Sequence, residues 1–164
     1  MQNSARLEKW SNRGMTTYRE RLWPAPWLFL ATALVLPATL LVFVPINFTV
    51  GVVVAVVFYV GICLAMVLSA PSVEVTETHF IAGRARLPLT AAGEAVAFEG
   101  AEATLERGQR LDARAWLVLR GWIAPVVRVE VTDPEDPAPY WLVSSRHPDK
   151  IVEALASYRN AATN

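Results

Sequence analysis

Charge is the first thing that this sequence lacks. Residues 22–73 contain no Lys, Arg, Asp or Glu, although these residues make up 18% of the whole chain. A soluble domain of this size usually carries about 25% charged residues, so the uncharged block excludes a simple soluble globule. The rest of the chain has an ordinary soluble composition. We therefore expect a membrane anchor joined to one small polar domain.

Residues that build metal, redox and phosphate sites are also scarce. Cys63 is the single cysteine, which excludes an intramolecular disulfide, a zinc cluster and a redox pair. His79 and His147 are the only histidines, so a multi-histidine metal site is excluded as well. The eight glycines include no glycine-rich phosphate loop. We expect neither a metal nor a cofactor.

The uncharged block is long enough for two membrane spans. A helix needs roughly 20 residues to cross a hydrocarbon core of about 30 Å, and residues 24–44 and 48–68 each supply that length. Between them, Pro45 cannot continue the first helix, and Asn47 is a good N-cap for the second. The sequence thus predicts an antiparallel transmembrane hairpin within residues 22–71.

Two features of the spans concern helix packing. Pro37 lies within the first span and predicts a kink there. The second span has small residues four positions apart, Gly51 with Ala55 and Gly61 with Ala65, which let helices approach closely. These pairs favour packing of the hairpin on itself, and the alternative is a homodimer or a protein partner docked on this face. No charged side chain lies at membrane depth, which argues against a pump or carrier.

The flanks of the block predict its orientation. Residues 1–21 form a basic juxtamembrane segment with five basic and two acidic residues, whereas the connection between the spans is uncharged. By the positive-inside rule, the N-terminus and the domain after the second span are cytoplasmic. Tyr18, Trp23 and Trp27 are expected to anchor the first span at the interface. We expect a multi-pass protein of the cell (inner) membrane with both termini cytoplasmic.

The polar domain comprises residues 72–160, and a short tail, residues 161–164, follows it. Its hydrophobic pattern has mostly period two, and the expected strands are residues 72–76, 79–87, 95–99, 103–106, 113–120, 127–132 and 140–146. A helix opens at Pro148, and its apolar face is formed by Ile151, Val152, Leu155 and Tyr158. With 10 basic and 13 acidic residues from Ser72 onward, this domain is not expected to bind nucleic acid.

Six or seven short strands closed by a C-terminal α-helix form a small mostly-β domain. This order resembles the pleckstrin-homology-like (PH-like) barrel, in which the helix plugs one open end of a strongly bent sheet. The alternative is a split β-sandwich with the helix packed on one face. In either case one helix face covers an opening that would otherwise expose the edges of a small sheet.

Three stretches around the hairpin also resemble an uncharacterised, domain-of-unknown-function family of actinobacterial two-helix membrane proteins. They are Tyr18-Arg-Glu-Arg-Leu-Trp-Pro24, Gly83-Arg-Ala-Arg-Leu-Pro-Leu89 and Tyr140-Trp-Leu-Val-Ser-Ser-Arg-His-Pro148. The last departs slightly from the Ser-Thr-Arg-x-Pro form of the family, and the resemblance covers about residues 16–158. Because the family has no established activity, the resemblance implies an inner-membrane location and nothing catalytic.

Side chains that could suggest catalysis have ordinary explanations. Ser144, Ser145, His147 and Asp149 crowd into one strand–helix junction, whereas a catalytic triad needs groups from separate elements; we expect Ser145 or His147 to cap the helix. Four glutamates are expected to lie on a solvent-exposed surface, namely Glu94, Glu99, Glu102 and Glu106. We therefore predict that the protein is not an enzyme.

Two arginines and three tryptophans could contact ligand or membrane. On one extended strand Arg84 and Arg86 would project to the same face, where we hypothesise contact with anionic lipid; the alternative is a solvated strand face. Trp116 and Trp141 are expected in the core, and Trp122 in an exposed loop near the bilayer.

The sequence as a whole favours an integral membrane protein whose cytoplasmic PH-like domain is a non-enzymatic adaptor for a protein partner or lipid headgroup. The alternative is an accessory subunit of a larger membrane complex that acts through its helical hairpin. The lipid bilayer is a partner in both interpretations, and nucleic acid is a partner in neither.

Overall fold

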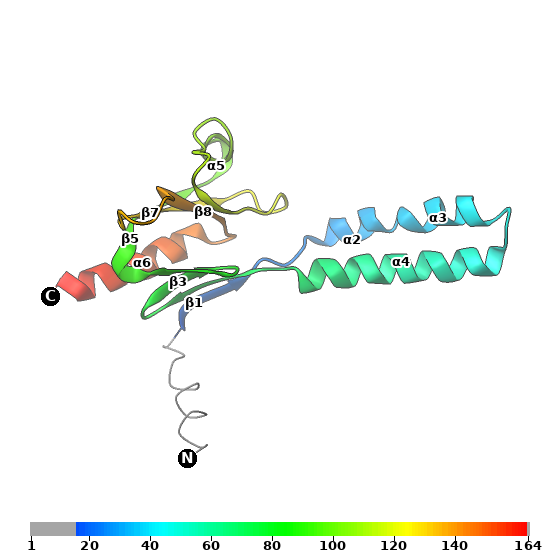
Figure 1. Ribbon diagram of the computed structural model, residues 1–164, viewed down its shortest axis with the longest axis horizontal. Helices are drawn as coiled ribbons and strands as arrows, with labels where there is room; N and C mark the ends of the chain where they lie inside the picture. Colours follow the sequence, from blue (N-terminus) through cyan, green and yellow to red (C-terminus); the bar gives the residue numbers. More distant parts are fainter. Residues whose placement is uncertain (1–15, 164) are drawn as a thin grey trace, which may run out of the picture. The chain divides into compact units, whose positions relative to one another are not determined.

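The computed structural model describes residues 16–163 of the 164-residue chain (Figure 1). Three residues of the predicted basic flank, Arg6, Lys9 and Arg13, lie outside the described residues. The chain divides into two compact units, which we call the β domain (residues 16–22 and 71–163) and the hairpin (residues 23–70). The hairpin is therefore an insertion within the β domain, whereas the sequence predicted a hairpin followed by a separate polar domain.

The hairpin consists of α2 (Pro26–Thr32), α3 (Val35–Phe43) and α4 (Phe48–Leu68). Within the described residues, two stretches are helical, long and apolar enough to cross a membrane, Pro26–Phe43 and Phe48–Leu68. The second has the predicted bounds, and the predicted cap is present, because Asn47 Oδ1 accepts a hydrogen bond from the Val50 N–H at 3.2 Å.

The first span is interrupted between α2 and α3. Ala33 and Leu34 form a turn one helical turn before Pro37, which has no N–H to bond to the Ala33 carbonyl. The Leu36 N–H bonds to that carbonyl instead, at 3.0 Å. The kink predicted from Pro37 is thus present as a short break in the helix.

Small residues near the start of α4 hold the hairpin together. Gly51 and Ala55 are the two buried residues of α4, and a Cβ placed on Gly51 would lie 2.9 Å from Phe43 Cβ. Gly61 and Ala65 are exposed, and no described atom lies within 4 Å of a Cβ placed on Gly61. Packing of the hairpin on itself therefore uses Gly51 and Ala55, and a homodimer or a protein partner docked on this helix stays a prediction.

The first sheet of the β domain is antiparallel in the order β1-β2-β3-β4. Its strands are β1 (Thr16–Arg21), β2 (Ser72–Thr76), β3 (His79–Ala82) and β4 (Ala85–Pro88). Residues 16–21, expected in the juxtamembrane segment, thus form an edge strand of the domain. This strand cannot be predicted from the local sequence, because its partner β2 follows only after the whole hairpin.

The stretch predicted as one strand, residues 79–87, is a β-hairpin. Gly83 (φ +65°) and Arg84 form the turn, and Ala82 pairs with Ala85. A continuous strand would have placed Arg84 and Arg86 on the same face as the buried Phe80. The turn instead brings Leu87 to that face, opposite Phe80, so the two arginines do not have to lie on a buried face.

The second sheet has the order β5-β7-β8-β6. Its strands are β5 (Ala92–Phe98), β6 (Trp116–Val118), β7 (Val126–Val131) and β8 (Tyr140–Ser144), and β6 runs parallel to β8. The short helix η1 (Leu89–Ala91) precedes β5, and α5 (Gly100–Arg107) follows it. The strand expected at residues 103–106 is wrong because this Ala- and Glu-rich stretch favours helix.

The C-terminal helix α6 (Pro148–Thr163) packs against β1 and β2 of one sheet and β5 and β7 of the other. Its Ile151 and Leu155 belong to a core shared with Phe80 of the first sheet and Trp141 of the second. The described strands form two four-stranded sheets and no closed barrel, unlike the expected single barrel of six or seven strands. The predicted apolar face of α6 is confirmed.

Candidate functional site

The two connections to the hairpin leave the β domain side by side. Leu22 N–H donates a hydrogen bond to the Pro71 carbonyl at 2.9 Å, one residue beyond the pair formed by Arg21 and Ser72. The Leu22 side chain is fully buried and belongs to the same core as Val73. The hairpin therefore begins and ends at neighbouring positions of two hydrogen-bonded strands. We call this place the exit site.

The Gly83–Arg84 turn lies next to the exit site. Gly83 N–H donates to the Ser72 carbonyl at 2.8 Å, and a Cβ placed on Gly83 would lie 3.6 Å from Pro71 Cβ. Arg84 is exposed in this turn, whereas Arg86 is exposed on β4 opposite Ile81. The expectation that both arginines share one strand face is wrong, but the turn itself places Arg84 next to the exit site.

Glu20 connects β1 to the segment that begins α6. Its carboxylate accepts hydrogen bonds from Ser145 Oγ at 2.5 Å, Tyr18 Oη at 2.9 Å and the Arg146 backbone N–H at 3.0 Å. The Glu20 side chain is only 10% exposed, and a buried carboxylate needs such partners. Burial of Tyr18 raises its pKa to about 12, and the neighbouring Glu20 contributes in the same direction although the Ser145 hydrogen bond opposes it.

The serines of the Ser-Ser-Arg-His-Pro stretch hold backbone in place. Ser145 Oγ accepts a hydrogen bond from the His147 N–H at 3.0 Å, so Ser145 holds the turn that precedes α6, whereas capping of the helix itself by Ser145 or His147 stays a prediction. Ser144 Oγ accepts from the Arg120 N–H at 3.0 Å. These contacts fix the strand–helix junction.

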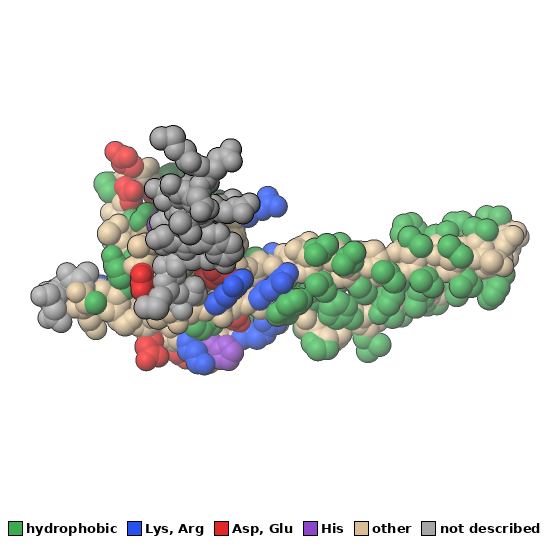
Figure 2. Space-filling model, turned by 90° about the horizontal axis from the view of Figure 1, so that it is seen from below, with side chains coloured by type: hydrophobic (Ala, Val, Ile, Leu, Met, Phe, Trp, Pro, Cys, Tyr) green, Lys and Arg blue, Asp and Glu red, His purple; other side chains and the backbone are tan. Residues whose placement is uncertain are grey.

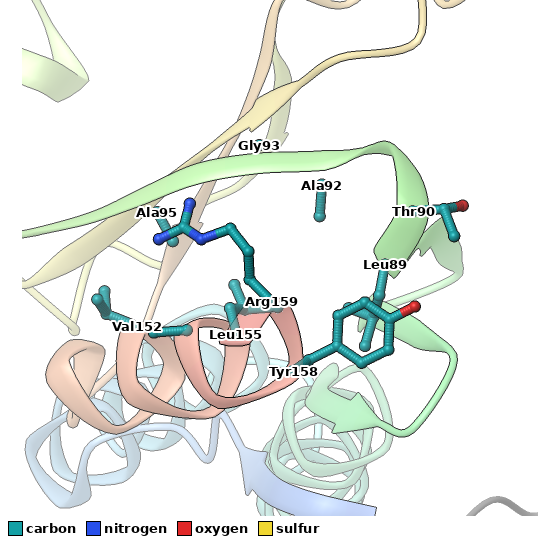
Figure 3. A pocket seen from close by; sticks show the side chains of 10 residues that line it. Leu89, Thr90, Ala92, Gly93, Ala95, Val152, Leu155, Tyr158 and Arg159 are labelled. Atoms are coloured by element: carbon teal, nitrogen blue, oxygen red, sulfur yellow. The ribbon is translucent and has the colours of Figure 1, made fainter. Parts of the chain in front are cut away.

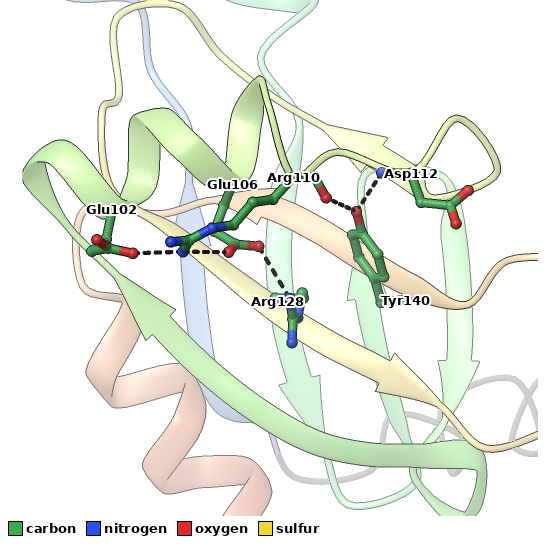
Figure 4. Close-up of polar contacts among 6 residues, drawn as sticks. All are labelled: Glu102, Glu106, Arg110, Asp112, Arg128 and Tyr140. Atoms are coloured by element: carbon green, nitrogen blue, oxygen red, sulfur yellow. Dashed lines mark hydrogen bonds and ion pairs between the residues drawn. The ribbon is translucent and has the colours of Figure 1, made fainter.

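A second polar cluster lies between α5 and the outer face of the second sheet (Figure 4). Glu106 is 2% exposed and forms ion pairs with Arg110 at 3.2 Å and Arg128 at 3.1 Å. Arg110 also binds the exposed Glu102 at 2.6 Å. The expectation that Glu106 lies on a solvent-exposed surface is therefore wrong. Its spacing from Ala103, three residues earlier on α5, brings both to the buried helix face.

The aromatic side chains divide between the two units. Trp23 and Trp27 are 46% and 59% exposed at the start of the hairpin, and interface anchoring by them stays a prediction. Tyr18 packs against the core of the β domain. Trp122, which was expected in an exposed loop, is partly buried against that core. Trp116, expected in the core, is 45% exposed.

A cavity of about 290 Å³ lies between α6 and β5 (Figure 3). Its strand wall is made of Ala92, Gly93 and Ala95, whereas Ala95 pairs with the larger Val129 of β7. This cavity was not predicted from the sequence. Alanine at core-facing positions of an edge strand is the signal that could have indicated it.

These features define a class of protein, a two-sheet β domain whose first two strands are separated in sequence by a helical hairpin apolar enough to cross a membrane. Among residues 16–163, no three His, Cys, Asp or Glu side chains cluster so that they could hold a metal ion.

The chain belongs to the family described as "Protein of unknown function (DUF3093)", which matches residues 17–155. This match confirms the resemblance to an uncharacterised family and extends from β1 into α6. The Tyr18–Pro24 and Tyr140–Pro148 stretches that carry the resemblance are the ones joined by the hydrogen bond between Ser145 and Glu20. No curated protein and no solved structure matches the chain.

Proposed function

We propose that this protein is a non-enzymatic, two-span membrane protein that holds a PH-like domain at the cytoplasmic membrane surface as an adaptor. The observation that carries the proposal is the insertion of the hairpin between two hydrogen-bonded strands, with Leu22 and Pro71 joined at the exit site. The two sheets followed by a C-terminal helix support the PH-like assignment.

Membrane insertion of the hairpin is supported by its surface. Large apolar side chains project outward from both spans, with Leu41 79% and Phe48 63% exposed, and Figure 2 shows many hydrophobic side chains on the visible face of the hairpin. A surface of this kind would promote association in water, whereas lipid tails match it. The Thr32 hydroxyl donates to the Leu28 carbonyl at 2.7 Å, which satisfies a polar side chain at membrane depth.

The pairing of β1 with β2 supports a topology with both ends of the hairpin on one side of the membrane. Strands that share a hydrogen-bonded ladder must lie in the same compartment, so the chain crosses an even number of times. Arg19 and Arg21 precede the first span, and the loop between the spans carries no charge. The positive-inside rule then favours the cytoplasmic side for the β domain.

The short connections support a position near the headgroups. Residues 23–25 precede α2, and residues 69 and 70 follow α4. Three extended residues reach at most about 11 Å, so the β domain cannot move far from the bilayer. Arg84, exposed beside the exit site, is well placed to attract anionic headgroups, an interaction of about 1 kcal/mol per arginine near the surface.

A second candidate function rests on the free face of α4. Gly61 and Ala65 are exposed and unused by the hairpin, and small residues favour close helix contacts in membranes. An accessory subunit of a larger complex would use this face. Gly61→Leu should then abolish co-purification of a stoichiometric partner in mild detergent, whereas an adaptor that acts through its β domain should retain that partner.

Cysteine labelling of intact cells tests the topology. Cys63→Ser supplies a cysteine-free background, Ile46→Cys reports on the loop between spans, and Asp136→Cys reports on the β domain. An impermeant maleimide should label position 46 in intact cells and position 136 only after lysis. Labelling of position 136 alone would invert the orientation, and labelling of both or neither before lysis would contradict a two-span hairpin.

A further inference from the structure

We propose that the end of the β domain at the exit site is a binding surface for a bilayer that contains anionic phospholipid. Its side chains are Arg84 on one side of the exit site and Arg120 and Arg146 on the other, and we call them the arginine rim. The surface rests on the proposed function, because this end reaches lipid headgroups only if the hairpin spans the membrane. Binding would also orient the β domain, with its opposite end away from the bilayer.

Arg84 flanks the exit site on the side of β2. Its side chain is exposed in the turn between β3 and β4. The neighbouring Gly83 N–H donates to the carbonyl of Ser72, the first residue of β2, at 2.8 Å. Arg84 therefore belongs to the end of the first sheet from which the hairpin leaves.

Arg120 and Arg146 flank the exit site on the side of β1. The Arg146 backbone N–H donates to the Glu20 carboxylate at 3.0 Å, and its guanidinium lies 3.8 Å from the same carboxylate. The Arg120 N–H donates to Ser144 Oγ at 3.0 Å, two residues before Arg146. Arg146 is exposed and Arg120 is partly exposed. Because a guanidinium has five N–H donors, each can bind a phosphate oxygen and keep its contacts within the protein.

The opposite end of the β domain is acidic. At this end β1 begins opposite Thr76, residues 132–139 join β7 to β8, and the Leu89 N–H bonds to the Thr78 carbonyl between the two sheets at 2.9 Å. Arg159 near the end of α6 is a basic residue here. The exposed carboxylates at this end outnumber it, namely Glu77, Glu94, Glu130, Asp133 and Glu135. An anionic surface would therefore repel this end and attract the arginine rim.

Carboxylates near the exit site do not cancel the arginine rim. Glu20 is only 10% exposed and accepts three hydrogen bonds within the domain. Glu99 and Asp149 are exposed near this end, but so are Arg21 and Lys150. Figure 2 shows several Lys and Arg side chains on the β domain close to where the hairpin begins. The charge of this end is therefore positive, although acidic residues outnumber basic ones from Ser72 onward.

Short connections bring this charge within range of the headgroups. Residues 23–25 and residues 69 and 70 separate the exit site from the spans, and three extended residues reach at most about 11 Å. The Debye length is about 10 Å at 0.1 M salt, so the attraction is only partly screened. An arginine near an anionic surface favours the bound state about fivefold, and the two sides of the rim act together.

Nitroxide relaxation of the intact protein in nanodiscs tests this inference. In a Cys63→Ser background, Gly121→Cys carries a nitroxide beside Arg120, where an added Cβ meets open space, and Pro134→Cys carries one at the acidic end. The discs contain a trace of lipid with a nickel-chelating headgroup in phosphatidylcholine alone or in an equal mixture with phosphatidylglycerol. We expect nickel to relax position 121 more strongly in the anionic discs than in the neutral ones, and position 134 in neither.

Matched variants locate the surface. Arg84→Gln combined with Arg120→Gln should lower the ratio of docked to undocked domain in anionic discs about 25-fold, or fivefold per arginine. Arg114→Gln combined with Arg159→Gln removes the same charge from exposed positions away from the exit site and should leave that ratio unchanged. If the Arg120 substitution impairs folding, Arg84→Gln alone should still lower the ratio about fivefold. Salt of about 1 M, where the Debye length is about 3 Å, should remove the difference between the discs.

The outcomes distinguish this surface from the proposed function. Protein that does not remain with the discs during size-exclusion chromatography would overturn insertion of the hairpin. Protein that remains with the discs but shows equal relaxation of position 121 in both lipids would overturn the anionic-lipid surface alone. Stronger relaxation at position 134 than at position 121 would overturn the orientation. Equal losses from the two double variants would show that total charge sets docking, and this would overturn the arginine rim.

Discussion

Glu20 accepts a hydrogen bond from Ser145 at 2.5 Å across 125 positions of the sequence. Glu20 precedes the hairpin and Ser145 lies near the end of the β domain, so this contact joins the two parts of the domain that the insertion separates. The Arg146 N–H and the Tyr18 hydroxyl complete the surroundings of the carboxylate. The contact therefore secures β1, the strand that directly precedes the hairpin in the chain.

Removal of this contact should weaken the attachment of β1. Ser145→Ala leaves a mostly buried carboxylate with one donor fewer, and we expect it to lower the free energy of unfolding by about 1–3 kcal/mol. Ser157→Ala, on the exposed side of α6, is the matched control with an effect near zero. Guanidinium unfolding of the intact chain in detergent, followed by tryptophan fluorescence, measures both. Equal midpoints for the two variants would contradict a role for Glu20 in holding β1.

Tyr18 should make the β domain sensitive to alkali. Its pKa is raised to about 12 in the folded protein, against about 10 in an unfolded chain. Below pH 10 both states are protonated and stability is complete; between pH 10 and 12 the unfolded state ionises first, so stability falls as pH rises. Tyr18→Phe should lose less stability across this window than the parent. Identical pH profiles of thermal unfolding for the two proteins would show that Tyr18 is not shielded.

Glu106 and Glu102 offer a matched comparison on one helix. Both bind Arg110, but Glu106 is 2% exposed and Glu102 57%. Glu106→Ala removes the buried partner of Arg128, which is itself 30% exposed, and should cost about 1.5–3 kcal/mol. Glu102→Ala removes an exposed pair and should cost about 0–1 kcal/mol. Denaturant unfolding distinguishes these values, and similar losses for both variants would contradict the assignment of Glu106 to the buried face of α5.

Two glycines of α4 should respond differently to alanine. A Cβ on Gly51 would lie 2.9 Å from Phe43 Cβ, whereas Gly61 has open space among the described residues. Gly51→Ala should therefore force α3 and α4 apart and lower the thermal stability of the hairpin in detergent. Gly61→Ala should leave it unchanged or raise it slightly, because alanine favours helix. A larger loss from Gly61→Ala would indicate that α4 packs through its other face.

Sequence reasoning succeeded where the signal was local. The length of the uncharged block and the cap at Asn47 predicted the bounds of α4, and the spacing of Ile151 and Leu155 predicted the buried face of α6. The alternation of Val127 and Val129 likewise predicted a half-buried strand, β7.

The failures have a common physical origin in distant partners. The Thr16–Arg21 stretch carries three charges and acquires a partner strand only after the hairpin, so its pattern resembled a membrane flank. Glu106 is buried because Arg110 and Arg128 neutralise it, and Arg128 comes from a strand distant in sequence. The alanines of β5 are a local signal for the cavity, but its other wall comes from α6, a helix distant in sequence.

Replacement of the hairpin by a tight turn tests the central claim most directly, namely that residues 23–70 are inserted between paired strands. Because Leu22 and Pro71 are hydrogen-bonded neighbours, an Asn-Gly turn of the type favoured in two-residue β-hairpins can join them once Pro71→Ala supplies the N–H that proline lacks. We predict that this hairpin-free chain is soluble, melts cooperatively and gives a dispersed amide NMR spectrum. The fragment 72–164, which lacks β1 and Leu22, should be unfolded or aggregated. A fragment 72–164 that folds as well as the joined chain, or a joined chain that does not fold, would contradict the account.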